Sequence, residues 1–196
     1  GNWHGMFGYF QRHQAFGQSA QRFWSRLSRM LMQRYKLTPF PHGQVIIHVR
    51  IGDYLWPKNQ RLFARYPLDQ QVRDALSLSR SLGGPSIIHL VSDDHSQVFK
   101  LLSSKSQGTI RPFKGINAEE DFMYLASHRH IIGSNSTFSL CAGRLSSELW
   151  GGAKVLGIPA QWNVDSSLNY QIQSEFSKCS FLYRIPSTSR IPDSDQ

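Results

Sequence analysis

Short runs of apolar and β-branched residues alternate along this chain with segments whose apolar residues recur at helical spacing. Buried strands are predicted at Val45–Ile51 and Ile87–Val91, and further strands in the stretches "GTIRPF", "HIIGSN" and "KVLGIP". Parallel strands need a crossover, and a helix supplies it, so this alternation predicts a parallel sheet. The fold class is therefore α/β, with a doubly wound parallel sheet of the Rossmann-like kind.

The helical segments between these strands have recognisable ends. A helix is predicted over residues 68–82, opened by Pro67 and closed by the turn Gly83–Pro85. Asn117 is expected to cap another helix, whose first turn carries acidic residues. A short helix is expected through Val98. An apolar stripe over residues 138–149 predicts a further helix.

The chain of 196 residues is predicted to hold one α/β domain at residues 41–183. Residues 1–40 would form an N-terminal linker with an amphipathic basic helix, and residues 184–196 a flexible tail. No stretch approaches the ~18 apolar residues that span a membrane, and residues 1–20 lack the apolar block of a signal peptide. A cytoplasmic location is expected.

The predicted helix at residues 16–36 has two faces. Ala20, Trp24, Leu27 and related apolar residues form a stripe, and four arginines lie mostly outside it. The simplest interpretation is a packing helix with a solvated basic face. The alternative is a peripheral contact of the arginines with a membrane surface or with nucleic acid.

The net charge of +9 favours an anionic partner, such as a nucleotide, a nucleic acid or an acidic membrane surface.

The two cysteines, Cys141 and Cys179, have neither a disulfide framework nor a metal-site spacing. Cys141 fits the apolar pattern of its helix and is interpreted as a small core residue.

Polar residues follow the first strand directly, in the stretch "VIIHVRIGDYL". His48, Arg50 and Asp53 would lie at its carboxyl end and in the next turn, which Gly52 allows to be tight. Ligands of doubly wound sheets bind beyond these strand ends, and a guanidinium suits phosphate oxygens. The alternative is an internal ion pair between Arg50 and Asp53.

A second anion-binding signal is the stretch "GSNSTFSLCAG", in which small hydroxyl residues lie between a strand and a helix start. Free backbone N–H groups and the positive end of the helix favour an anion there. An ordinary helix cap is the alternative. Two such strand ends in one basic chain favour a diphosphate between them. The candidate ligand residues in this stretch are Ser136, Thr137 and Ser139.

The third polar strand end is "HLVSDDH", with Asp93 and Asp94. Helix capping is the default role for these carboxylates, and the others considered are a metal ion or hydrogen bonds from a base or ribose. No third ligand with suitable spacing supports a metal site, and no metal is expected. The histidines form no metal pattern, and "HRH" at 128–130 is interpreted as a surface helix end.

Several common motifs are missing from the sequence. It contains no G-x-G-x-x-G, no G-x-x-x-x-G-K-[ST] and no G-x-S-x-G. The usual dinucleotide site, the P-loop and the hydrolase elbow are therefore excluded.

The stretches "HVRIGDYL", "IIHLVSDD" and "DFMYLASHRHIIGSNSTFSLCAGRL" resemble, in order and spacing, the motifs of the alpha-1,2-fucosyltransferase family. The segment "FGYFQRHQAF" is similar to the one before the basic helix in those enzymes. The resemblance runs from about residue 8 to about 160.

This resemblance implies a GT-B type glycosyltransferase that moves fucose from GDP-fucose to a glycan hydroxyl with inversion and without a metal. The acceptor would be a galactose hydroxyl. Residues 41–183 would be the nucleotide-sugar-binding donor lobe, with Arg50 on the diphosphate and His48 and Asp93 near the nucleotide. Ser136, Thr137 and Ser139 would line the phosphate-binding helix start, and Asp53 is the nearest candidate for the base. No nucleic acid partner is expected.

The sequence departs from the family in three places. Ile51 replaces a second arginine, "FSLCAG" replaces "FSWWGA", and the family's Gly-rich opening is absent with the half of the protein that it begins. The chain is thus expected to be the donor lobe with its linker, in a truncated form. The alternatives are another GDP-sugar transferase, of the alpha-1,6 or protein O-fucosyltransferase type, and a non-catalytic module that binds nucleic acid or acidic glycans.

Overall fold

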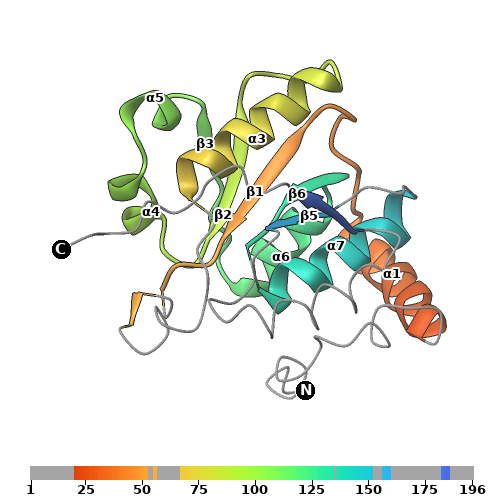
Figure 1. Ribbon diagram of the computed structural model, residues 1–196. Coiled ribbons are helices and arrows are strands. Elements are labelled where there is room, and N and C mark those ends of the chain that lie inside the picture. Colours follow the sequence, from red (N-terminus) through yellow and green to blue (C-terminus); the bar gives the residue numbers. More distant parts are fainter. Residues whose placement is uncertain are drawn as a thin grey trace, which may run out of the picture.

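A computed structural model describes residues 20–52, 55–56, 67–134, 136–151, 156–159 and 182–185 of the chain. Within these ranges, helices and strands alternate as the sequence predicts (Figure 1). The elements are α1 (Gln21–Tyr35), β1 (Val45–Val49), α3 (Leu68–Ser81), β2 (Ile88–Ser92), α4 (His95–Leu101), α5 (Ser104–Gln107), β3 (Ile110–Pro112), α6 (Ala118–Ala126), β4 (His130–Ile132), α7 (Thr137–Trp150), β5 (Leu156–Pro159) and β6 (Leu182–Ile185).

The described strands form a six-stranded sheet in the order β3-β2-β1-β4-β5-β6. Each neighbouring pair is parallel. The strand order is that of a doubly wound, Rossmann-like sheet, and the chain reverses its direction of winding between β1 and β4. The predicted α/β fold is therefore confirmed, and the sheet has its topological switch point where β1 and β4 lie side by side.

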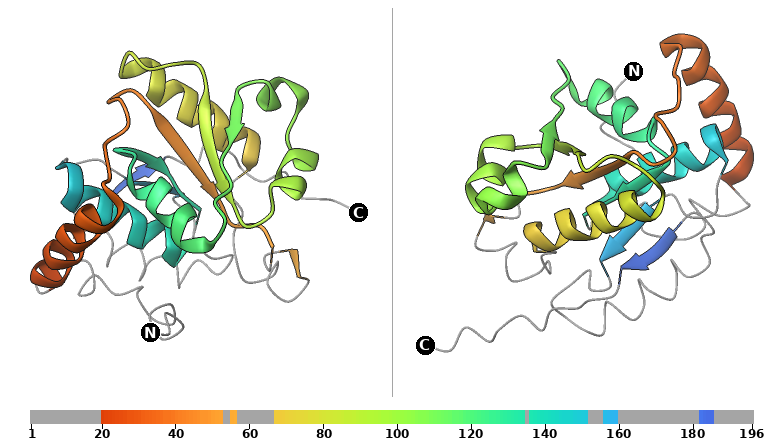
Figure 2. Two further views of the ribbon diagram at one scale, coloured as in Figure 1. Left: turned by 180° about the vertical axis from the view of Figure 1, so that it is seen from behind. Right: turned by 90° about the horizontal axis from the view of Figure 1, so that it is seen from above.

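Alternating residues of the strands supply two separate cores. Val45, Ile47 and Val49 of β1 pack with α3 and α4 on one face of the sheet. Ile46 packs with α1, α6 and α7 on the other face. This period of two arises because successive side chains of a strand point to opposite faces. The result is a sheet covered by helices on both sides (Figure 2).

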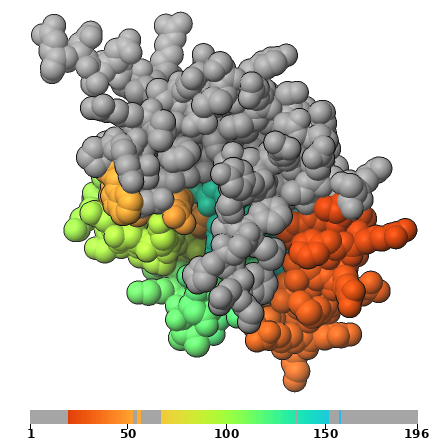
Figure 3. Space-filling view, turned by 90° about the horizontal axis from the view of Figure 1, so that it is seen from below, coloured from red at the N-terminus to blue at the C-terminus, as the bar shows by residue number. Residues whose placement is uncertain are grey.

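Helix α1 belongs to the same core as the α/β domain. Its Trp24 and Leu31 are buried among residues of α6 and α7, and Gln21 and Ser25 bond the Glu148 carboxylate of α7. The outer side of α1 is at the surface (Figure 3). The expected boundary at residue 40 therefore divides a shared interior, and α1 is a packed layer of the domain.

The carboxyl-terminal boundary also differs from the prediction. The tail was expected to begin at Arg184, but Arg184 and Ile185 lie in β6 and pair with Ile158 and Pro159 of β5. A four-residue edge strand carries too few residues for a period to show in the sequence. Pairing with β5 is what makes it a strand.

The amino ends of the strands are closed by a tight backbone contact. A Cβ added to Gly84 would lie 1.9 Å from the Gly43 carbonyl oxygen. The Ser79 hydroxyl lies 2.9 Å from that same oxygen and 2.7 Å from the Pro85 carbonyl oxygen. The loop before β1 and the loop before β2 therefore touch through their backbones, and glycine is required because no side chain fits.

Among the described residues, no helix is both long enough and apolar enough to cross a membrane.

Candidate functional site

Three strand ends meet at the carboxyl edge of the sheet. Arg50 follows β1 directly, Asp93 follows β2, and Ser134 lies in the loop after β4. β1 pairs with both β2 and β4, so these residues are neighbours across the switch point. This is the place in an open α/β sheet where a ligand is expected.

The Asp93 carboxylate clamps the turn after β1. It accepts hydrogen bonds from the backbone N–H groups of Ile51, at 2.9 Å, and Gly52, at 3.1 Å. A Cβ on Gly52 would lie 2.9 Å from the Asp93 Oδ2 atom. Glycine at this position therefore leaves room for the carboxylate to approach the backbone.

Asp93 is also the ion-pair partner of Arg50. The Arg50 Nε atom lies 3.5 Å from Asp93 Oδ2, and 40% of the Arg50 side chain stays exposed. This ion pair joins two strand ends, and its acid is a different one from the Asp53 of the predicted alternative. Asp53, the partner and base considered from the sequence, lies outside the described residues.

The loop between β4 and α7 completes this edge. The Ser134 hydroxyl accepts a hydrogen bond from the Arg50 backbone N–H at 3.2 Å. The Ser136 side chain caps α7 by accepting from the Phe138 N–H at 3.3 Å. Thr137, the first residue of the helix, is half-buried. The structure thus brings the end of β1 against the start of a 14-residue helix, whose first amides have no partner within the helix.

His48 and Ser139 bond each other in the interior. The His48 Nδ1 atom lies 2.6 Å from the Ser139 hydroxyl, and the two side chains are 4% and 0% exposed. Both side chains are thus used inside the fold, and the role predicted for them near a nucleotide stays a prediction. His48 has the strand orientation of Ile46, which points it at α7, and Ser139 lies on the inner side of that helix.

The buried imidazole of His48 is neutral at neutral pH. Burial lowers the pKa of His48 to about 3, and the positive charge of Arg50 lowers it too. The ring also stacks on Phe138, with 5.1 Å between ring centroids. His48 therefore fixes α7 against β1 and adds no charge to the site.

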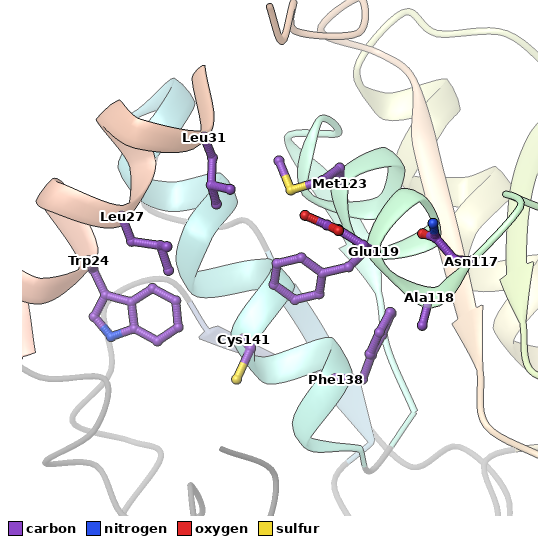
Figure 4. Close-up of a pocket in the computed structure, with 10 residues that line it drawn as sticks. Trp24, Leu27, Leu31, Asn117, Ala118, Glu119, Met123, Phe138 and Cys141 are labelled. Carbon is purple, nitrogen blue, oxygen red and sulfur yellow. The ribbon is translucent and has the colours of Figure 1, made fainter. Parts of the chain in front are cut away.

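An apolar pocket lies beside this edge, between α1, α6 and α7 (Figure 4). Its volume is about 330 Å³, which is within the range of small-molecule sites. Apolar side chains form most of its wall, with Glu119 and Asn117 at one end. The lining residues are Trp24, Leu27, Leu31, Asn117, Ala118, Glu119, Phe122, Met123, Phe138 and Cys141.

Phe138 connects the pocket with the switch point. Its ring lines the pocket, stacks on His48 and meets Phe122 edge to face with 5.3 Å between centroids. Cys141 is buried, as the sequence predicts, and burial raises the pKa of its thiol to about 12. The thiol is therefore protonated and unreactive at neutral pH.

A cluster of polar aromatic residues lies at the opposite, amino edge of the sheet. The Tyr124 hydroxyl lies 2.5 Å from His89 Nδ1, and Gln44 Nε2 lies 2.8 Å from His89 Nε2. His128 is fully buried and stacks on Phe40 with 4.0 Å between centroids. Burial lowers the pKa of His89, and it lowers that of His128 to about 3.

The interpretation of "HRH" as a surface helix end is therefore wrong for His128. Two of its partners, in the loop before β1 and in β2, are distant in the sequence, and a third is the nearby carbonyl of Tyr124 in α6. No local pattern marks such a residue as buried. The sequence indicated neither this cluster nor the apolar pocket.

The second acidic residue after β2 is a helix cap. The Asp94 side chain accepts a hydrogen bond from the Gln97 N–H at 3.0 Å at the start of α4. Across the described residues, no group of three or more histidines, cysteines and carboxylates is placed to hold a metal ion. Metal-free chemistry stays a prediction.

No family model matches this chain. A comparison with curated proteins finds no match either.

Proposed function

We propose that the edge between β1 and β4 binds the diphosphate of GDP-fucose, and that the chain is the donor lobe of a GT-B type, inverting fucosyltransferase. The observation that carries this proposal is that two groups able to bind an anion, an arginine and a helix start, both lie at the switch point. The Arg50 guanidinium is partly exposed at the end of β1, and the hydrogen bond from the Arg50 backbone N–H to Ser134 ties that strand end to the loop that leads into α7.

The chemistry of transfer needs negative charge to be stabilised on the departing GDP. A guanidinium offers paired donors to phosphate oxygens, and the amides of a helix start add fixed positive ends. In this proposal they stabilise the leaving group together, without a metal ion. In this proposal Arg50 and the helix start at Ser136 and Thr137 contact the diphosphate, while His48 and Ser139 hold the loop in place.

The role of Asp93 is also revised within the proposal. Its carboxylate already has two backbone donors and a guanidinium, so it acts by shaping the turn after β1. Asp53 stays the candidate for the base that takes the acceptor proton during transfer to a galactose hydroxyl.

Titration calorimetry of the full chain with GDP, GDP-fucose, GDP-mannose and ATP tests the proposal. We expect GDP-fucose and GDP to bind, with the same affinity in the presence of a chelator. The Arg50→Ala variant should lose roughly 10- to 100-fold in affinity, because a charge-assisted hydrogen bond contributes about 1.5–3 kcal/mol. Arg73→Ala is the matched control, since Arg73 is an exposed arginine of α3 bonded to Gln70.

Three results would contradict the proposal. One is GDP binding that Arg50→Ala leaves unchanged, in a variant whose melting temperature shows it to be folded. Another is binding that requires added Mg²⁺. The third is binding of oligonucleotides with a steep salt dependence in place of GDP, which would favour the nucleic-acid module.

A further inference from the structure

Helix α1 turns an unusual face to solvent. Its inner face is occupied by Trp24, Ser28 and Leu31, which are buried. On the outer face, Phe23 is 49% exposed and Met30 52% exposed. These two residues are seven positions apart, which is two helical turns, so they form a short apolar ridge along the outside of the helix.

Arginines lie beside this ridge. Arg22, Arg26, Arg29 and Arg34 are all exposed, and α1 contains no acidic residue. Arg29 bonds the Ser25 carbonyl within the helix, and Arg34 lies over the Tyr35 ring. None of the four forms an ion pair with a carboxylate in the ranges that the structure describes. The charge of this face is therefore not neutralised within the described fold.

We propose that the outer face of α1 docks on the surface of a bilayer that contains anionic lipids. Phe23 and Met30 would enter the boundary between headgroups and acyl chains, and the arginines would lie among the anionic headgroups. This division of labour is typical of helices that lie in a membrane interface. The proposal is independent of the GDP-fucose site.

Two other partners fit this face less well. A nucleic acid would engage the arginines, but it offers no apolar layer for an exposed phenylalanine and methionine. A second copy of the chain would bring four arginines against four arginines across a two-fold axis, and like charges oppose that contact. A bilayer satisfies both the charge and the apolar ridge.

The inner contacts of α1 suit it to bind as a fixed part of the domain. Arg144 of α7 is 2.6 Å from Glu148, and Glu148 in turn accepts hydrogen bonds from Gln21 at 2.9 Å and Ser25 at 2.8 Å. This partly buried network holds the helix on α7. The outer face would therefore dock without α1 leaving the core.

Vesicle co-sedimentation of the full chain tests the charge component. We expect binding to phosphatidylcholine vesicles that contain phosphatidylglycerol, and no binding to phosphatidylcholine alone. The double variant Arg22→Glu/Arg26→Glu should weaken binding roughly 25-fold or more, because each arginine near an anionic surface contributes about fivefold. The matched control is Arg73→Glu/Arg80→Glu on α3, which makes the same change of charge on the opposite face and should change binding far less.

The apolar component has its own variants. Phe23→Ser/Met30→Ser should weaken vesicle binding roughly tenfold at physiological salt, where the charge attraction is screened. Leu101→Ser/Ile116→Ser is its control, because these residues are also exposed and belong to other parts of the chain than α1. Thermal melts confirm that each variant is folded.

Three outcomes would overturn the proposal. The first is no binding of the unaltered chain to anionic vesicles. The second is equal loss in the α1 variants and their controls, which would indicate a diffuse effect of net charge. The third is tight binding to oligonucleotides that ignores Phe23 and Met30, which would assign the face to nucleic acid.

Discussion

Polar residues lie at both edges of the sheet, but they are partly exposed at one edge and largely buried at the other. At the carboxyl edge, Arg50 and Asp93 are charged and partly exposed. At the amino edge, His89, Tyr124 and His128 are largely withdrawn from solvent, and burial lowers the pKa of both histidines. Charged side chains therefore stay accessible at one edge, while neutral polar side chains are packed into the fold at the other.

The difference follows from how each edge is closed. The backbone contact of Gly43 with Gly84 and the stacking of Phe40 on His128 seal the amino edge. At the carboxyl edge, the Asp93 carboxylate bonds the backbone of the turn after β1 at Gly52, and the side chains of Arg50 and Asp93 stay partly exposed. A polar group in the sealed edge has to be neutral and hydrogen-bonded, whereas the open edge tolerates charge.

The largest effect on stability is expected from disrupting the backbone contact between Gly43 and Gly84. Gly84→Ala would place a Cβ 1.9 Å from the Gly43 carbonyl oxygen, and backbone has to move to admit it. We expect a loss of about 3 kcal/mol in the free energy of unfolding, measured with urea. Gly108→Ala is the control, because the nearest atom would be 3.8 Å away and φ is −64°. Equal stability of the two variants would contradict a sealed edge.

Acid should destabilise both edges through their histidines. The pKa of His48 and that of His128 are about 3 in the folded protein, whereas an unfolded histidine has a pKa of about 6.5. Below pH 6.5 the unfolded chain therefore binds more protons than the folded one. Stability is therefore complete above that pH and falls as the pH drops. The expected loss is about 1 kcal/mol for each histidine between pH 6.5 and 5.5.

The two histidines can be separated by substitution. His48→Gln and His128→Gln should each remove about 1 kcal/mol of this loss, one at each edge, when unfolding is measured at both pH values. His89, whose pKa is also lowered by burial, contributes in the same direction. Asp69 of α3 acts in a different pH range. A hydrogen bond from the Ser106 hydroxyl lowers the pKa of its carboxyl, so its stabilisation is lost only as the pH falls below the ordinary range of a carboxyl. A slope that neither variant changes would show that the histidines are not its source.

The smallest effect is expected at the open edge. Asp93→Asn keeps one acceptor oxygen and should lose one of the two backbone hydrogen bonds, which lowers the free energy of unfolding by about 1 kcal/mol. Asp94→Asn is its neighbour and control, because asparagine caps a helix as well as aspartate does. If both variants cost the same, the clamp has no special role.

Local patterns predicted most of the fold. The Asn117 cap and the helix end before Gly83, whose φ is +68°, depend on neighbouring residues and are confirmed. Strand β6 and the burial of His128 depend on partners far along the chain, and the sequence did not indicate them. Sequence information on a residue is thus reliable when its partners are local.

The same distinction divides the candidate site. The strand ends were predicted, because apolar runs and glycine turns mark them. The partner of Arg50 was not, since Asp93 is on a different strand that the sheet brings alongside. The inward orientation of His48 was available from the period of two, as it shares the face of Ile46. Its pairing with Ser139 required the position of α7.

The packing of α1 determines the smallest fragment of this chain that keeps a complete core. Trp24 and Leu31 form one wall of an interior whose other walls are α6 and α7. A shortened protein that starts at β1 would open that wall, expose its apolar lining to water and favour aggregation. Any fusion or domain exchange that uses this sheet should therefore carry the helix at 21–35 with it.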